Sequence, residues 1–141
     1  MIVGTARPAS MPRLWIVSGA VLGFLGVAAG SFGAHGLKSL LEANGQSANW
    51  ETAVRYCLVH ALALLAVGLA SSVPQSGAAR GLLAGAGWTM LLGTFVFSGF
   101  LAALALSGLR ILGEIVPIGG MLMLAGWACL AAAGWCSTAG R

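Results

Sequence analysis

Residues 81–106 read GLLAGAGWTMLLGTFVFSGFLAALAL, a stretch of 26 residues without a single charged side chain. A helix needs about 20 predominantly apolar residues to cross the hydrocarbon core of a bilayer. Because lipid offers no hydrogen-bond partner, each backbone polar group must be satisfied within its own segment, and a helix does this. The stretch therefore predicts a transmembrane helix.

Three further stretches have the same character, at about residues 14–34, 52–72 and 115–136. The connections at 71–80 and 107–114 are short, and short connections make consecutive helices antiparallel neighbours. The sequence predicts an all-α fold, a membrane-embedded four-helix bundle that runs up-down-up-down. It forms one domain over 14–136, with a flexible N-terminal tail at 1–13 and a C-terminal tail at 137–141.

The composition supports this class of protein. Hydrophobic residues make up 59% of the chain and charged residues 7%, whereas a soluble domain carries roughly 25% charged residues. Most of the surface must therefore face lipid. The seven basic residues form no cluster, which argues against a nucleic-acid partner. The chain has no aspartate and no nucleotide-binding glycine motif, and we expect no cofactor.

The first apolar stretch allows another interpretation, a cleaved signal peptide. Arg7 and Arg13 precede it and would supply the basic region of such a peptide. The stretch is longer than the 7–15 apolar residues that are typical of signal peptides, and no small-x-small cleavage site follows it. We therefore expect a retained transmembrane helix.

The connection at 35–51 is the longest and most polar of the three. Leu37, Leu40 and Leu41 recur within it at helical spacing, which predicts a short interfacial helix. Asn44-Gly45 is typical of a helix end or a turn. The three cysteines lie inside apolar stretches and are expected to pack as small apolar side chains.

Glycines recur at helical spacing, and we expect them to let helix backbones approach closely. The alternatives are a ligand groove or a homodimer seam. Four tryptophans toward the segment ends, Trp15, Trp50, Trp127 and Trp135, are predicted to anchor the helices at the interface. The packing glycines are Gly19, Gly23, Gly26, Gly30, Gly81, Gly85, Gly119 and Gly120.

With four crossings both termini lie on one side of the membrane. That side holds four basic residues and the other holds three. Basic residues are enriched in cytoplasmic loops, so the sequence predicts cytoplasmic termini and a location in the bacterial inner membrane.

Polar side chains gather toward the other end of the predicted bundle. His60 lies roughly two helical turns inside the second apolar stretch, and ionisable side chains at such depth suggest a function. The alternatives are snorkelling side chains, an ordinary Glu51–Arg55 ion pair, or metal or haem ligation by two histidines, for which the spacing gives little support. The candidate cluster is His35, Glu51, Arg55, Tyr56, His60, Ser98, Arg110 and Glu114.

Four motifs occur in a familiar order: GSFGAHGL at 30–37, WETA at 50–53 followed by Tyr56 and HALALL at 60–65, GTFVFSG at 93–99, and PIGG at 117–120 followed by Gly126-Trp127. With them the chain, over about residues 14–135, resembles the YgdD/YwdK-like family of small inner-membrane proteins, domain of unknown function 423.

The resemblance implies four membrane helices and no established activity. The family's recurrent polar positions correspond to His35, Trp50, Tyr56, His60, Ser98 and Pro117. The chain departs from the family at Cys57, where glutamine is usual, and at Val116, where threonine is usual. Both departures remove a hydrogen-bonding side chain near the candidate cluster.

Two functions are expected from these observations. The first is a non-enzymatic structural or accessory component that packs in the lipid bilayer against itself, as a homo-oligomer, or against a larger membrane complex. The second is a small-molecule or ion-handling membrane protein that uses the polar cluster. An enzyme is disfavoured because no set of nucleophile, base and orienting group can be assembled.

Overall fold

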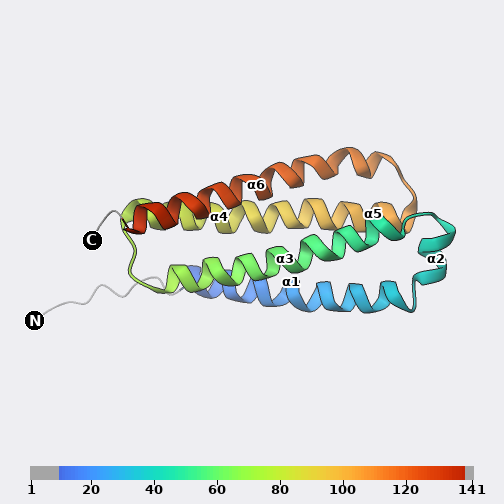
Figure 1. The fold of residues 1–141 in the computed structure, drawn as a ribbon, viewed down its shortest axis with the longest axis horizontal. Coiled ribbons are helices and arrows are strands. Elements are labelled where there is room, and N and C mark those ends of the chain that lie inside the picture. Colours follow the sequence, from blue (N-terminus) through green and yellow to red (C-terminus); the bar gives the residue numbers. More distant parts are fainter. Residues whose placement is uncertain (1–9, 139–141) are drawn as a thin grey trace, which may run out of the picture.

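The computed structural model describes residues 10–138, and these form helices joined by short connections (Figure 1). No strand occurs within them, and four helical spans are long and apolar enough to cross a membrane, which confirms the predicted fold class. The elements are α1 (Ser10–Ala34), α2 (Lys38–Ala43), α3 (Ser47–Ser72), α4 (Gly77–Thr94), η1 (Phe95–Gly99), α5 (Phe100–Ser107) and α6 (Ile111–Thr138).

Each spanning helix begins four or five residues before its predicted start, because its first turn or so contains a charged residue, namely Arg13, Glu51, Arg80 or Glu114, at which the apolar stretch was taken to begin. Residues 10–13 and 137–138, predicted as tails, are therefore helical; the rest of both tails lies outside the described residues. Ser76 caps α4 by accepting a hydrogen bond from the Ala79 amide at 3.2 Å. Gly45 and Gly108 end α2 and α5 with φ of +63° and +71°, a region that favours glycine.

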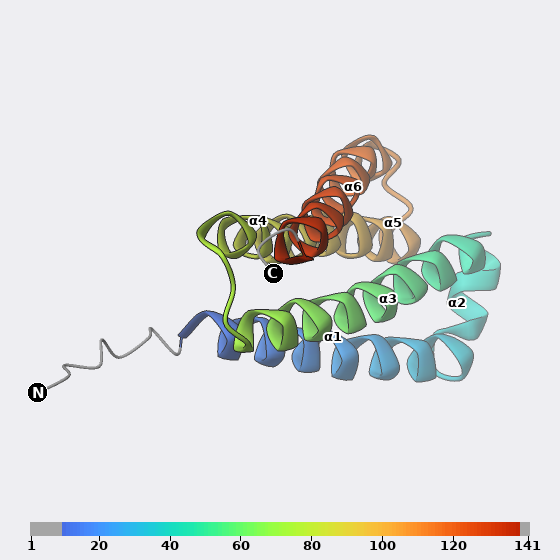
Figure 2. The same cartoon turned by 60° about the vertical axis from the view of Figure 1, so that its left-hand side comes forward.

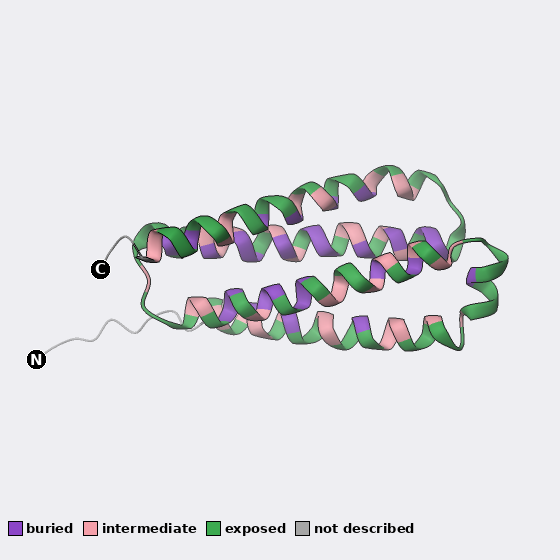
Figure 3. Cartoon of the chain, in the orientation of Figure 1, coloured by how far each residue is buried: buried purple, intermediate pink, exposed green. Residues whose placement is uncertain are grey.

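The four spans are arranged as two helical hairpins. In the first α1 packs along α3, and in the second α6 packs along α4, η1 and α5, while α3 and α4 join the hairpins (Figures 1 and 2). The middle spans are consequently the more buried (Figure 3). In their apolar windows 44% and 39% of the residues are buried, whereas in each outer span the share is 17%. Ser10, Thr138 and the α3–α4 turn lie at one end of the molecule, and α2 lies at the other.

The core near the α3–α4 turn is built around Trp15. This side chain is wholly buried among Leu64, Val67 and Met90. A Cβ on Gly87 of α4 would collide with the indole ring, so the absence of a side chain there makes room for it. The prediction that Trp15 is an interfacial anchor is therefore wrong. Aromatic side chains bury a large apolar area, and α4 lies close enough to enclose the Trp15 ring in the core.

Trp50 is a second tryptophan that was predicted as an interfacial anchor and is instead buried. It is 8% exposed, and its Nε1 donates to the Ala29 carbonyl at 3.1 Å, which ties α3 to α1. It packs beside Leu41 of α2 and Ala105 of α5. The predicted short helix at this end exists as α2, and its Leu41 faces protein while Leu40 is exposed.

The glycines of α1 lie along α3. A Cβ on Gly19 would be 2.7 Å from the Ala61 carbonyl oxygen, and one on Gly26 would be 2.6 Å from the Leu58 side chain. A Cβ on Gly23 or Gly30 would have more room, at 3.9 and 3.4 Å from the nearest side-chain atom of α3. These distances place the two backbones close together along the first hairpin.

The glycines of α4 behave differently. Gly81 has no atom within 4 Å of its Cβ position, so its predicted role in helix packing is wrong. Gly85 makes an ordinary contact with the Cys129 sulfur at 3.8 Å. The spacing of Gly81 places it on the outer face of α4, whereas Gly87 and Gly93 occupy the inner face.

The third span contains a π-helix that the sequence analysis did not foresee. Phe95–Gly99 forms η1 between α4 and α5. Aromatic and β-branched residues followed by Ser98 and Gly99 have weak α-helix propensity, so the segment tolerates the change. A Cβ on Gly119 of α6 would collide with the Phe97 backbone nitrogen and lie 2.8 Å from the Gly93 oxygen. The backbone of α6 therefore rests directly on η1.

Candidate functional site

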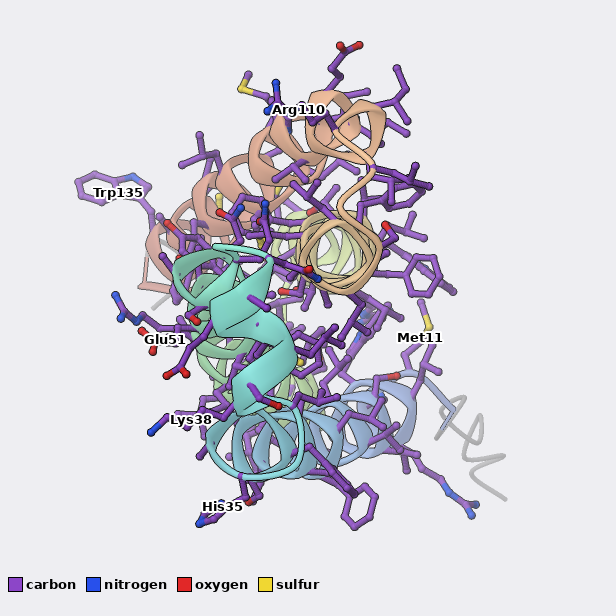
Figure 4. All side chains as sticks on the ribbon, turned by 90° about the vertical axis from the view of Figure 1, so that its right-hand side faces the viewer. Met11, His35, Lys38, Glu51, Arg110 and Trp135 are labelled. Atoms are coloured by element: carbon purple, nitrogen blue, oxygen red, sulfur yellow. The ribbon has the colours of Figure 1, made fainter. Side chains whose placement is uncertain are left out.

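Five of the eight residues of the predicted polar cluster, His35, Glu51, Arg55, Arg110 and Glu114, do not come together. His35 is exposed, and its Nδ1 lies 3.1 Å from the Ser31 oxygen of its own helix. Viewed from the α2 end, His35, Glu51 and Arg110 project outward on different sides of the molecule (Figure 4). Glu114 and Arg55 are also exposed. These five residues lie toward the α2 end of the bundle, but the helices point their side chains away from one another.

The Glu51–Arg55 ion pair, one of the alternatives for this end, does not form. Within residues 10–138 the one ion pair joins Lys38 and Glu42 of α2, at 4.0 Å and with both side chains exposed. Such an exposed pair contributes little to stability. The charged residues at this end therefore act as solvated or headgroup-facing side chains.

His60 lies deeper than predicted and is 3% exposed. It is the fourteenth of the 26 residues of α3, and therefore lies near the middle of the span. Its Nδ1 lies 2.9 Å from the Tyr56 carbonyl oxygen, and its Nε2 lies 3.2 Å from Nε1 of Trp127 in α6. A carbonyl only accepts and an indole N–H only donates. His60 is therefore neutral, with its proton on Nδ1.

This arrangement makes the imidazole a polar link between two helices. Trp127 donates to it across the gap between α3 and α6, and the two rings meet edge to face at 6.0 Å. Trp127 was predicted as an interfacial anchor; it is 43% exposed, but its only polar atom is bonded to His60. Neither ring nitrogen of His60 is left for a further partner.

Tyr56 and Phe97 extend this contact into an aromatic wall. The Tyr56 ring stacks on Phe97 of η1 at 4.5 Å and on His60 at 6.1 Å. A cavity of about 330 Å³, hereafter the His60 pocket, opens beside them. Its lining residues come from α3, η1 and α6 and are Tyr56, His60, Phe97, Pro117, Gly120, Met121, Met123, Leu124 and Trp127.

The α6 side of the His60 pocket contains an irregular turn. Pro117 is the seventh residue of α6 rather than one of its first, as the sequence had suggested, because α6 begins at Ile111. It has no N–H for the Gly113 carbonyl, and a proline at such a position bends a helix. Gly120 lies three residues further on, and a Cβ on it would lie 3.8 Å from the Phe97 ring. Two irregular helix segments, η1 and the Pro117 turn, therefore meet at this pocket.

Two hydroxyl groups lie in the third span close to the pocket. Thr94 Oγ1 donates to the Met90 carbonyl at 2.7 Å and is thus satisfied within its helix. Ser98 Oγ is buried and has no hydrogen-bond partner among residues 10–138. A buried unpaired hydroxyl costs free energy, and its neighbour Phe97 forms the pocket wall.

Three of the eight predicted residues, Tyr56, His60 and Ser98, lie at or beside this site. The sequence analysis missed Phe97, Met121 and Trp127 as members. For Met121 and Trp127 the signal was the helical spacing of 117, 120, 121, 124 and 127, which puts these positions on one face of α6; no spacing pointed to Phe97. Within residues 10–138 no three His, Cys, Asp or Glu side chains lie together as metal ligands would.

Comparison with known proteins connects this fold to a family. The model of a family described as a protein of unknown function (DUF423) matches residues 29–120. A UPF0382 membrane protein of Staphylococcus haemolyticus is 43% identical over 118 residues, which cover 84% of this chain and 92% of the relative. One from Staphylococcus saprophyticus is 41% identical, with 84% and 93% covered. No solved structure matches the chain. The chain is a multi-pass membrane protein and belongs to the DUF423 family.

Proposed function

We propose that this protein is not an enzyme and binds a small, mainly apolar molecule in the His60 pocket. The observation that carries the proposal is the meeting of η1 and the Pro117 turn at one cavity in the membrane. A proline inside a helix removes a hydrogen bond, and π-turns occur frequently at functional sites. A bundle that served packing alone would have no need of both irregularities at one place.

The walls of the pocket indicate the chemistry of its ligand. They are aromatic and thioether surfaces, with Tyr56 the one hydroxyl-bearing side chain among them. Binding sites of this size are mostly apolar, with a few polar groups that orient the ligand. Tyr56, Met121 and Trp127 are all exposed on the outer surface, so the pocket opens toward lipid. A flat or chain-like apolar molecule with one hydrogen-bonding group fits this description.

The bonding of His60 supports binding rather than catalysis or proton transfer. A general base needs a free nitrogen within reach of the proton that it abstracts. Both nitrogens of His60 are engaged, and Ser98 Oγ has no base beside it. The imidazole instead fixes the distance between α3 and α6, and thereby the width of the pocket.

Photolabelling tests this proposal. The purified protein in detergent is irradiated with a phenyl-diazirine photolabel, and the labelled peptides are identified by mass spectrometry. We expect labelling at 117–127 to fall severalfold in Met121→Trp, whose larger side chain fills the pocket. Leu69→Trp, at an equally exposed position of α3 (64% against 68%), is the matched control. Equal labelling in all three proteins would contradict a binding pocket.

An accessory role in a membrane complex is the second candidate. It is supported by the outer face of α6, where Ala125, Ala128 and Ala132 are exposed at helical spacing. Small side chains on a helix allow another helix to approach closely in lipid. This face admits a second copy of the chain or a helix of a larger complex.

Cysteine crosslinking in native membranes tests the second candidate. In a background whose three native cysteines are alanine, Ala128→Cys is expected to give a crosslinked species, either a dimer or a heavier adduct. Val21→Cys, on the outer face of α1 among large apolar side chains, is the control. A monomer alone at position 128 would remove the support for this role.

We further propose that the protein resides in the bacterial inner membrane with both termini in the cytoplasm. Four basic residues on the side of the termini, against three on the other, support this orientation. Reporter fusions at the C-terminus should be active only in the cytoplasmic form. Activity of an exported reporter would reverse the orientation.

A further inference from the structure

A second cavity, of about 940 Å³, lies at the end of the molecule opposite α2, where α1 begins and α3 turns into α4 (Figure 1). We call it the arginine cleft. The residues of interest are Arg13 and Trp15 from α1, Ser71 and Gln75 from the end of α3 and its turn, and Arg80 and Leu83 from α4. The sequence analysis assigned no function to this end of the bundle.

The two arginines of this cleft have no carboxylate side chain near them among residues 10–138. Arg13 and Arg80 come from different helices and line the same cavity, and both are exposed. The chain has three side-chain carboxylates, Glu42, Glu51 and Glu114, and all of them lie at the α2 end. Arg80 makes one long contact, from Nη2 to the Gln75 carbonyl at 3.4 Å, and within residues 10–138 Arg13 makes no hydrogen bond or ion pair. Among residues 10–138, two cationic groups thus line one cavity without an anionic partner.

The polar groups of the cleft lie at its outer end, and the apolar groups lie deeper. The arginines, Ser71 and Gln75 belong to the helix ends, where a spanning protein meets the headgroups. Trp15 and Leu83 are buried and lie further into the core. The cleft also includes the start of α4, and the first turn of a helix favours negative charge. One amphiphile, anionic at its head and apolar below, matches this sequence of surfaces.

Trp15 supplies an independent observation. It lines the cleft and is 0% exposed, yet its Nε1 has no hydrogen-bond acceptor among the described residues. A buried donor without an acceptor costs free energy, and indole N–H groups usually find a partner when buried. A ligand that carries ester or phosphate oxygens into the cleft would, with a small rotation of the indole, give this donor an acceptor that residues 10–138 do not provide.

From these observations we propose that the arginine cleft binds one anionic phospholipid, whose phosphate lies between Arg13 and Arg80 and whose acyl chain lies over Ile16 and Val17, on the side of the buried Trp15 and Leu83. Arginine is suited to phosphate because its planar fork of donors matches the phosphate oxygens. A zwitterionic lipid lacks the net negative charge that the two arginines would neutralise. The site is separate from the His60 pocket and does not depend on it.

Native mass spectrometry of the full chain tests the proposal. The protein is purified in non-ionic detergent and titrated with phosphatidylglycerol or phosphatidylcholine of the same acyl chains. We expect wild type to prefer phosphatidylglycerol by about thirtyfold, given roughly 1 kcal/mol for each of the two basic residues near an anionic lipid. The double variant Arg13→Gln/Arg80→Gln should lose most of this preference.

The α2 end offers a matched control. Arg55→Gln/Arg110→Gln also removes two exposed arginines near a membrane face and lowers the net charge equally. It should retain the preference of wild type. If both double variants lose it equally, the preference reflects net charge alone and the site is refuted. The monodispersity and helical content of each variant are checked first. If the glutamine variant does not fold, Arg13→Lys/Arg80→Lys replaces it; this variant keeps the charge and should bind phosphatidylglycerol partially.

Other occupants of the cleft give different results. A diazirine placed on the acyl chain of phosphatidylglycerol should label peptides of α1 and α4 near Trp15 and Leu83. Competition by excess inorganic phosphate would mean that the site recognises phosphate alone. Binding that appears only after deletion of residues 1–9 would show the chain's own N-terminus in the cleft, and labelling that vanishes with dimerisation would show a second copy. Each of these three results overturns the lipid proposal.

Discussion

At the scale of single residues, one hydrogen bond deep in the membrane organises the candidate site. The bond from Trp127 to His60 joins the two hairpins at the middle of α3. Interhelical hydrogen bonds in membrane proteins contribute on average about 0.6 kcal/mol, with larger values near 2 kcal/mol. Its loss should therefore be measurable and should also free a nitrogen of His60.

Trp127→Phe is expected to lower the free energy of unfolding by about 1 kcal/mol, because Nε2 of His60 then lacks a donor. Unfolding in mixed micelles followed by circular dichroism measures the change. His60→Phe and the double variant complete a thermodynamic cycle. A coupling energy of zero between the two positions would mean that the bond does not form in the folded protein.

Gly119→Ala should destabilise the protein by about 1–3 kcal/mol, as overpacking does, because the new methyl group meets backbone atoms of Phe97 and Gly93 that cannot turn aside. Gly81→Ala is the control, since the space at Gly81 is open. There alanine should be neutral or stabilise the helix by up to about 1 kcal/mol. Equal effects in thermal unfolding would contradict the contact of α6 with η1.

Sequence reasoning found His60 and Tyr56 because an ionisable residue inside an apolar stretch is visible in one dimension. It did not place Trp127 opposite His60, because a contact between residues 67 positions apart depends on how two helices rotate about their axes. It also grouped His35, Arg110 and Glu114 with them from their membrane depth alone. Depth follows from position along a helix, whereas the direction of a side chain follows from packing.

At the scale of elements, the spans were predicted well and their irregularities were not. An apolar stretch of sufficient length must be helical in lipid, so four helices followed from composition. The π-turn instead accompanies a contact between helices, here the backbone of Gly119 against Phe97. No spacing of residue types within 93–99 predicts it. The polar first turns of the helices were missed for a simpler reason, since hydropathy marks the membrane and not the helix.

α2 is the element whose stability depends most on one side chain. Leu41 is 2% exposed and packs between Trp50 and Ala105. Leu41→Ala should remove about 2 kcal/mol of local packing energy. We expect faster amide hydrogen exchange over residues 36–46 with little change in α4 or α6. Leu40→Ala, at an exposed position of the same helix, should leave exchange unaltered; a similar increase in both variants would show that α2 is not held by Leu41.

At the scale of the whole molecule, the two hairpins are separable units. Each pairs an outer helix with a middle one, and the connection between them is the turn around Pro74. Helices that are already inserted can associate side by side in the bilayer. The joint between α3 and α4, with the His60–Trp127 bond beside it, should therefore form even when the turn is cut.

Coexpression of residues 1–74 with residues 75–141, the latter preceded by a start methionine, is expected to give two fragments that copurify through a tag on one of them. A cut between 109 and 110, inside the second hairpin, leaves α6 alone and should yield less complex, because α6 then has to find its partner unaided. Failure of the 74/75 fragments to copurify, with both present in the membrane, would contradict the two-hairpin description.

The π-helix η1 has a consequence for how relatives of this chain are aligned. A π-turn holds one residue more than an α-helical turn, so it absorbs an inserted residue without rotating the helix on either side. If this segment were a regular α-helix, deleting one residue between Phe95 and Gly99 would rotate α5 by about 100° relative to α4. Leu101, Leu104 and Ala105, now buried, would turn toward lipid. A homologue one residue shorter here should therefore have a plain α-helix and the same buried face, and the gap belongs inside η1 rather than in a loop.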